Sequence, residues 1–166
     1  QSELAPLALG PDLYMINAGR PGRIYSEGED QWIALRTINS ASGVVLGSMS
    51  VREGGGATDP TGHWYYHCDN NISNAHITRY DISGDTPVAG PTSAQHPYGS
   101  RNLVIAGDGS RLFWRGYVYD AALTETGYLG AEVYATTLHG DVAFTASQAI
   151  NAVNGAVLAS LPVTST

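Results

Sequence analysis

Apolar side chains alternate with polar ones along most of this chain, and few stretches repeat every three or four residues. Period-two alternation is the pattern of a half-buried strand, whereas helices require apolar positions three and four apart. Strands are therefore predicted at His63–His67, Arg111–Trp114 and Asp141–Thr145, each after a Gly-containing turn, and a similar strand at Asp12–Ile16. The pattern predicts an all-β protein.

A strand, a turn and a second strand recur along the chain. Ile38–Val51 aligns without a gap on Ile150–Val163, and both segments place Asn second and Gly sixth. Weaker copies begin at Arg79 and Val118, with Asp in place of Asn. The equivalent positions are Asn39, Asp81, Asp120 and Asn151. The first two steps between them are about 40 residues long, and the last step is shorter.

A period of this length is typical of propellers and solenoids. We predict a single domain over residues 1–166, built from four units at 11–52, 57–91, 100–131 and 138–164. Glu53–Gly56 and Pro91–Gly99 are expected to be connectors between units, because glycine and proline favour turns and loops.

The order Asp108-Gly109-Ser110, Arg111–Trp114 and Val118-Tyr119-Asp120, with a closing Gly155–Val163 run, resembles the blades of YVTN and WD40-like β-propellers. No Trp-Asp dipeptide closes a blade, and the repeats are unequal in length. The resemblance implies a propeller-like array of about four four-stranded antiparallel blades. Such an array either closes on itself or forms part of a ring completed by a second chain, which makes a homo-oligomer an expected partner.

Composition narrows the class of partner. Only 14% of the 166 residues are charged, the net charge is −7, and every cation is Arg because the chain has no Lys. Nucleic acids and anionic membranes require a basic surface, so neither is expected as a partner. The longest apolar runs, such as Ala156–Ala159, are too short to cross a bilayer. The start at Gln1, the absence of Lys and the abundance of Gly, Ser, Thr and Tyr favour an extracellular or cell-surface location.

No residue pattern specifies catalysis or a cofactor. His63 and His67 would lie about 13 Å apart on one strand face, too far to share a metal ion. Cys68 is expected to be an inert, partly buried thiol. The Asp residues at 59, 108 and 141 fit turn chemistry, and the chain has no Gly-x-Ser-x-Gly nucleophile motif. We therefore expect no catalytic residues, no metal site and no cofactor.

Binding is the favoured function, because propeller loops gather on two faces of a rigid scaffold. Two predicted loops mix Arg with aromatic side chains, which suits forked hydrogen bonding and stacking on a carbohydrate or peptide. The predicted ligand-binding residues are Arg20, Arg23 and Tyr25 in the first loop and His96, Tyr98 and Arg101 in the second.

Two alternatives remain open from the sequence: a structural subunit that assembles through exposed edges, and an enzyme domain that acts on polysaccharide through a central channel. The three Trp residues, at 32, 64 and 114, are expected in the core. Asn71 begins a glycosylation sequon that matters only in a eukaryotic secretory context.

Overall fold

A computed structural model describes residues 15–28, 30–70 and 72–162, which form sixteen strands and no helix. Blade 1 consists of β1 (Met15–Ala18), β2 (Arg23–Glu27), β3 (Trp32–Asn39) and β4 (Val45–Arg52). Blade 2 consists of β5 (Gly54–Thr58), β6 (Trp64–Asp69), β7 (Ile77–Asp81) and β8 (Val88–Thr92).

Blade 3 consists of β9 (Leu103–Ile105), β10 (Arg111–Trp114), β11 (Tyr117–Asp120) and β12 (Glu125–Tyr128). Blade 4 consists of β13 (Ala135–Thr136), β14 (Val142–Phe144), β15 (Gln148–Asn151) and β16 (Val157–Ser160). Every blade is an antiparallel meander in which each strand pairs with the next along the chain. The predicted fold class, an all-β propeller-like array of four four-stranded blades, is confirmed.

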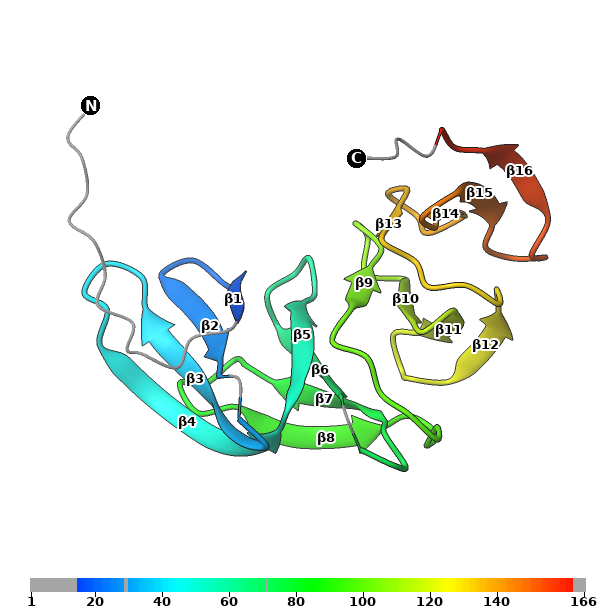
Figure 1. The fold of residues 1–166 in the computed structure, drawn as a ribbon. Helices are drawn as coiled ribbons and strands as arrows, with labels where there is room; N and C mark the ends of the chain where they lie inside the picture. The colour runs from blue at the N-terminus through cyan, green and yellow to red at the C-terminus, as the bar shows by residue number, and fades with distance from the viewer. Residues whose placement is uncertain (1–14, 29, 71, 163–166) are drawn as a thin grey trace.

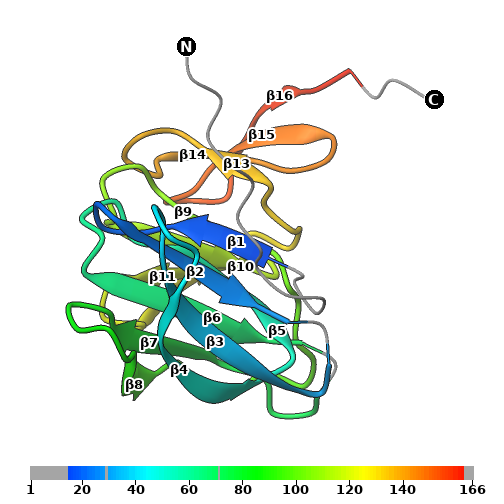
Figure 2. The same cartoon turned by 90° about the vertical axis from the view of Figure 1, so that its left-hand side faces the viewer.

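The blades follow one another along an arc, with their first strands on its inner side (Figure 1). β5 contacts both β1 and β9, and β9 also contacts β13. Figure 2 shows blade 1 in front of blade 2 when the arc is viewed from its left side. Within the described residues β1 pairs only with β2, and β16 only with β15.

Three apolar cores lie between successive blades. Tyr25, Leu35 and Tyr65 belong to the core between blades 1 and 2. Tyr66, Leu112 and Trp114 belong to the next core, and Phe113, Val118 and Ala143 to the third. The neighbours Tyr65 and Tyr66 enter different cores because adjacent side chains of a strand point to opposite faces. The central strands β6 and β10 therefore read as almost continuous apolar runs, as expected for sheets covered on both faces.

The predicted repeat is confirmed at its turns. The third strand of every blade ends at one of the four equivalent residues: Asn39, Asp81, Asp120 or Asn151. In each case a side-chain oxygen accepts a hydrogen bond from the backbone N–H two residues later. The pairing of the third and fourth strands shifts register just before that residue in all four blades.

The turn between the first and second strands also recurs, and each copy contains a glycine with positive φ, at Gly22, Gly62, Gly109 and Gly140. A Cβ on Gly62 would lie 3.0 Å from the backbone of Arg20, and one on Gly140 would lie 3.1 Å from the Cβ of Ala106. In blades 2 to 4 this turn therefore packs closely against the equivalent turn of the preceding blade, whereas a Cβ on Gly22 in blade 1 would meet nothing within 4 Å.

In blade 1 the structure corrects the predicted position of the second strand. The predicted strand Asp12–Ile16 was matched to the second strands of the other blades, but the second strand here is β2, Arg23–Glu27. Its preceding turn is Arg20-Pro21-Gly22, in which the Arg23 N–H donates to the Arg20 carbonyl. Residues 12–14 lie outside the described residues, as do Asn71 and the end of the last predicted unit at 163–164.

One predicted connector was wrong, and the start of the other was misplaced. Glu53–Gly56 is not a linker, because Gly54, Gly55 and Gly56 are buried in β5. A Cβ on Gly55 would lie 2.0 Å from the carbonyl oxygen of Arg101, so the glycines allow neighbouring backbone to approach closely. The predicted connector at Pro91–Gly99 does lie between blades 2 and 3, but it starts after β8, which continues to Thr92. That the four blades form a single domain remains a prediction.

The three Trp residues differ in burial. Trp114 is completely buried, Trp64 is partly buried, and Trp32 is 59% exposed at the start of β3. Placing all three in the core was therefore wrong for Trp32, whose indole instead packs under the guanidinium of Arg52.

Candidate functional site

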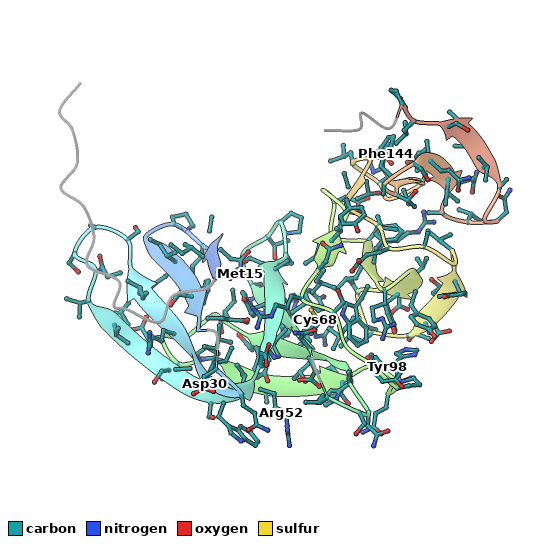
Figure 3. All side chains as sticks on the ribbon, viewed as in Figure 1. Met15, Asp30, Arg52, Cys68, Tyr98 and Phe144 are labelled. Carbon is teal, nitrogen blue, oxygen red and sulfur yellow. The ribbon has the colours of Figure 1, made fainter. Side chains whose placement is uncertain are left out.

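An aromatic cluster reaches the surface between blades 2 and 3, and we call it the tyrosine patch. Tyr98 comes from the segment that joins β8 to β9, and Figure 3 shows its ring at the margin of the molecule. Tyr117 begins β11, and Tyr128 ends β12 directly opposite it. The patch consists of His96, Tyr98, Arg115, Tyr117, Glu125 and Tyr128.

Three rings of the patch, those of His96, Tyr117 and Tyr128, form a continuous series from the interior outward. His96 stacks on Tyr117 with ring centroids 3.8 Å apart, and Tyr117 contacts Tyr128 at 4.6 Å. Tyr128, the outermost residue of the series, is 60% exposed, and Tyr98, beside Arg115, is 70% exposed. Large exposed aromatic side chains that rest on buried ones form a rigid apolar surface with polar hydroxyl edges.

A tight turn places Tyr117 in this series. Arg115 and Gly116 both have positive φ, of 53° and 82°, which is the signature of a two-residue hairpin turn matched to strand twist. A Cβ on Gly116 would lie 2.7 Å from the carbonyl oxygen of Ala131, so glycine is required there. The Arg115 side chain leaves the turn, donates a hydrogen bond to the carbonyl of Tyr98, and lies over the Tyr98 ring at 5.9 Å.

His96 anchors the patch from below. Its backbone N–H donates to the carbonyl of Ala75 at 2.8 Å, and its Nε2 lies 2.7 Å from the Tyr119 hydroxyl oxygen. Glu125 places Oε2 3.6 Å from the same nitrogen. Burial lowers the pKa of His96 despite the opposing carboxylate of Glu125. A neutral imidazole is therefore favoured near pH 7, which suits a ring that stacks on tyrosine.

The structure places the six predicted binding residues in separate regions. Of these, only His96 and Tyr98 belong to the patch. Arg20 and Arg23 both pair with Asp85 on the far side of the blade 1–blade 2 boundary, at 3.5 and 2.8 Å. Tyr25 lies on β2 rather than in a loop and is completely buried, with its hydroxyl donating to the carbonyl of Ile82 at 3.2 Å.

Arg101 also lies apart from the patch. Its guanidinium pairs with Glu53, which in turn accepts a hydrogen bond from the side chain of Asn70 at 3.2 Å. This arrangement ties the end of the β8–β9 segment to the start of blade 2.

Sequence reasoning missed Arg115, Tyr117, Glu125 and Tyr128. A signal was present, because Tyr117 and Tyr128 are the outermost paired positions of a predicted hairpin and so face the same way. No local sequence pattern could show that His96 and Tyr98, from the segment after blade 2, lie beside these residues of blade 3.

A second polar cluster is buried between blades 1 and 2. Glu27, whose side chain is fully buried, accepts hydrogen bonds at Oε1 from the Tyr65 hydroxyl at 2.7 Å and from His67 Nδ1 at 2.9 Å. On the other side of the ring, His67 Nε2 lies 3.7 Å from Asp69 Oδ1. Burial, followed by the nearby carboxylate of Glu27, raises the pKa of Tyr65 well above its usual value. These hydrogen bonds link β2 of blade 1 to β6 of blade 2, and they pair the buried Glu27 carboxylate, which apolar neighbours could not do.

Cys68 lies at the centre of the molecule (Figure 3). It is completely buried, and its thiol lies 3.1 Å from the carbonyl oxygens of Gly55 and Ser100. Burial raises its pKa well above the ordinary value, which keeps the thiol protonated. Among the described residues, no three His, Cys, Asp or Glu side chains are arranged to hold a metal ion, and no helix is long and apolar enough to cross a membrane.

Comparison with known proteins adds information about the fold. No protein family profile matches the chain, and no curated protein sequence matches it. Among solved structures, a chain described as Kuenenia stuttgartiensis hydrazine synthase is similar, with a TM-score of 0.65 over 90% of this chain and 49% of that one. The sequences are 15% identical over this alignment, so the similarity shows a shared fold alone. The chain spans about half the length of that structure.

Proposed function

We propose that this protein is a non-catalytic carbohydrate-binding module of the YVTN and WD40-like repeat class, acting outside the cell or at its surface. The observation that carries the proposal is the tyrosine patch, in which the exposed Tyr128 ring stacks on Tyr117 and, through it, on buried His96, while exposed Tyr98 lies beneath the guanidinium of Arg115. Aromatic faces pack against the C–H faces of sugar rings, while charged side chains at the edge bind hydroxyl groups.

The repeat class is supported by the recurring turns. Each blade carries Asn or Asp at the end of its third strand and a positive-φ glycine before its second strand. A rigid scaffold of this kind presents segments such as 93–102 without requiring them to fold on binding. Carbohydrate is favoured over peptide because the exposed groups of the patch are rings and charges, and the nearby edge strand β12 offers only four residues for strand pairing.

Affinity electrophoresis and calorimetry against a panel of soluble polysaccharides test this function. The wild type should bind at least one polymer. Tyr128→Ala should weaken that binding about five- to tenfold, the size expected for one aromatic contact. Its melting temperature should change little, because the ring is mostly exposed.

Tyr134→Ala is the matched control, because Tyr134 is similarly exposed, at 58%, but lies outside the patch. It should leave binding unchanged. Binding of a peptide library member instead, lost in Tyr128→Ala, would assign the patch to peptide and refute the carbohydrate proposal. No binding to any polymer, or equal losses in the two variants, would also refute it.

A further inference from the structure

A hollow between blades 1 and 2 is lined by a different set of side chains from those of the tyrosine patch. It is lined by Arg52, Ile72, Ser73, Asn74 and His76. Arg52 ends β4 of blade 1, whereas the other residues come from the segment between β6 and β7 of blade 2. Figure 3 shows Arg52 at the lower edge of the molecule. The lining is rich in hydrogen-bond donors and contains no carboxylate.

Arg52 is held in place by an aromatic ring. Its guanidinium carbon lies 4.4 Å from the centre of the Trp32 ring, an arrangement that fixes the plane of the guanidinium without using its N–H donors. This contact also explains why Trp32 lies exposed at the start of β3. Because the Trp32 ring contacts the face of the Arg52 guanidinium, the N–H groups at its edge can bind two oxygens of an anion.

His76 is oriented from behind. Asp69 Oδ2 lies 3.0 Å from its Nδ1 and 3.1 Å from its backbone nitrogen, and the Asp69 side chain is only 7% exposed. The hydrogen bond to Asp69 raises the pKa of His76. Burial would disfavour the carboxylate, but the hydrogen bond and charge of His76 outweigh it and lower the pKa of Asp69. The pair therefore favours a charged imidazolium whose Nε2 is not used by Asp69.

The described side chains that line the hollow include two cationic groups, Arg52 and His76, and no anionic one. Among the described residues, the charged and titratable groups that line the hollow or pair with His76 are Arg52, Asp69 and, beyond Asp69, His67. Asp69 balances one positive charge, so Arg52 remains uncompensated within the lining. Glu53, the neighbouring carboxylate in sequence, is already paired with Arg101. In a chain with a net charge of −7, this is a local site of opposite sign.

We propose that this hollow binds a small oxyanion, a carboxylate or a phosphate group, between the guanidinium of Arg52 and Nε2–H of His76. Ser73 and Asn74 supply additional neutral donors at the rim. Asp69 is a positioning residue that holds the imidazole in its donor orientation. The site shares no side chain with the tyrosine patch, and the proposal does not depend on the carbohydrate function.

The experiment titrates the full chain with inorganic phosphate, and separately with acetate, while NMR follows the imidazole Cε1–H signals at constant ionic strength. We expect a saturable shift of the His76 signal with a dissociation constant of about 1–10 mM, typical of a shallow site with two charge-assisted contacts. Affinity should fall as the pH rises through the pKa of His76, because the neutral ring keeps its one N–H on Nδ1, where it donates to Asp69, and Nε2 no longer has a proton to donate.

Three variants separate the site from general charge effects. Arg52→Gln and His76→Asn should each weaken binding at least about fivefold. Asn keeps an amide donor near the position of Nδ1, so the contact with Asp69 is retained while Nε2 is lost. Arg36→Gln removes the same charge from the middle of β3, outside the lining, and should leave the affinity unchanged.

The two anions distinguish the sources of the ligand group. Saturation by phosphate alone assigns the site to phosphate-bearing ligands, and saturation by both anions assigns it to oxyanions in general. A linear shift that chloride reproduces, or an equal loss of affinity in Arg36→Gln, would overturn the proposal. Carbohydrate binding by the tyrosine patch can fail without affecting any of these outcomes.

Discussion

At the scale of single residues, the glycines of β5 show how a flexible-looking run becomes rigid. Gly54, Gly55 and Gly56 lack side chains because neighbouring groups occupy the space on both faces of the strand. A Cβ on Gly54 would lie 2.1 Å from the Cys68 carbonyl oxygen, and one on Gly56 would lie 2.4 Å from the Tyr65 hydroxyl. The role of these glycines is close approach of backbone and rings, and none of the three has positive φ.

We predict that Gly55→Ala lowers the free energy of unfolding by about 1–3 kcal/mol, because the new methyl group must displace the backbone of Arg101. Urea denaturation measures the change. Gly127→Ala in β12 is the control, since a Cβ there meets nothing within 4 Å and the expected change is less than about 0.5 kcal/mol. Similar destabilisation by both substitutions would contradict this account.

At the scale of elements, the four hairpins between third and fourth strands share one turn chemistry. Asn39 Oδ1 accepts from the N–H groups of Ala41 and Ser42 at 2.9 and 3.0 Å. Asn151 Oδ1 accepts from those of Val153 and Asn154 at 2.9 and 3.2 Å. Asp81 and Asp120 use a carboxylate oxygen in the same way. The requirement is therefore a short side chain with an acceptor oxygen, and the charge is secondary.

Asn151→Ala should destabilise the protein by about 1 kcal/mol, because two turn N–H groups lose their acceptor while remaining accessible to water. Asn151→Asp should retain most of the stability, since Asp81 and Asp120 show that a carboxylate can fill this role. Thermal unfolding of the two variants provides the comparison. If Asp destabilises as much as Ala, the acceptor oxygen does not control the turn.

At the scale of the whole molecule, the two end blades differ from the middle ones. Blades 2 and 3 are covered on both faces, whereas blades 1 and 4 each pack against one neighbouring blade. The outer strand β16 is exposed along its whole length, including Val157 and Leu158 at 55% and 53%. Exposed apolar strands favour association with another chain.

We expect the chain to associate in solution, in keeping with a ring completed by a second copy. Sedimentation equilibrium should give a mass above the 17.5 kDa of one chain. Leu158→Glu should reduce that mass by placing a charge on the exposed strand, and Ser160→Glu at the end of the same strand provides a milder comparison. A strictly monomeric wild type at all concentrations would contradict the half-ring hypothesis.

The sequence by itself determined the third and fourth strands of the four blades, the second strands of blades 2 to 4 and their turns. Alternation of apolar and polar residues, the Asn or Asp that ends each third strand, and the glycines of the tight turns all act over a few neighbouring residues. Their effects are visible in a local stretch of sequence, which is why the repeat and the all-β class could be predicted. The same reasoning missed β2, since Arg20–Tyr25 looked like a polar loop although Tyr25 is buried against Tyr65.

Only the tertiary structure decided which residues meet across blades. The burial of β5 depends on Arg101 approaching from the β8–β9 segment, and the tyrosine patch depends on His96 reaching Tyr117 in blade 3. Arg52 of blade 1 and His76 of blade 2 likewise line one hollow only because the two blades pack side by side. These contacts depend on the angle and separation at which whole sheets pack, and neither is encoded in the period of any one strand.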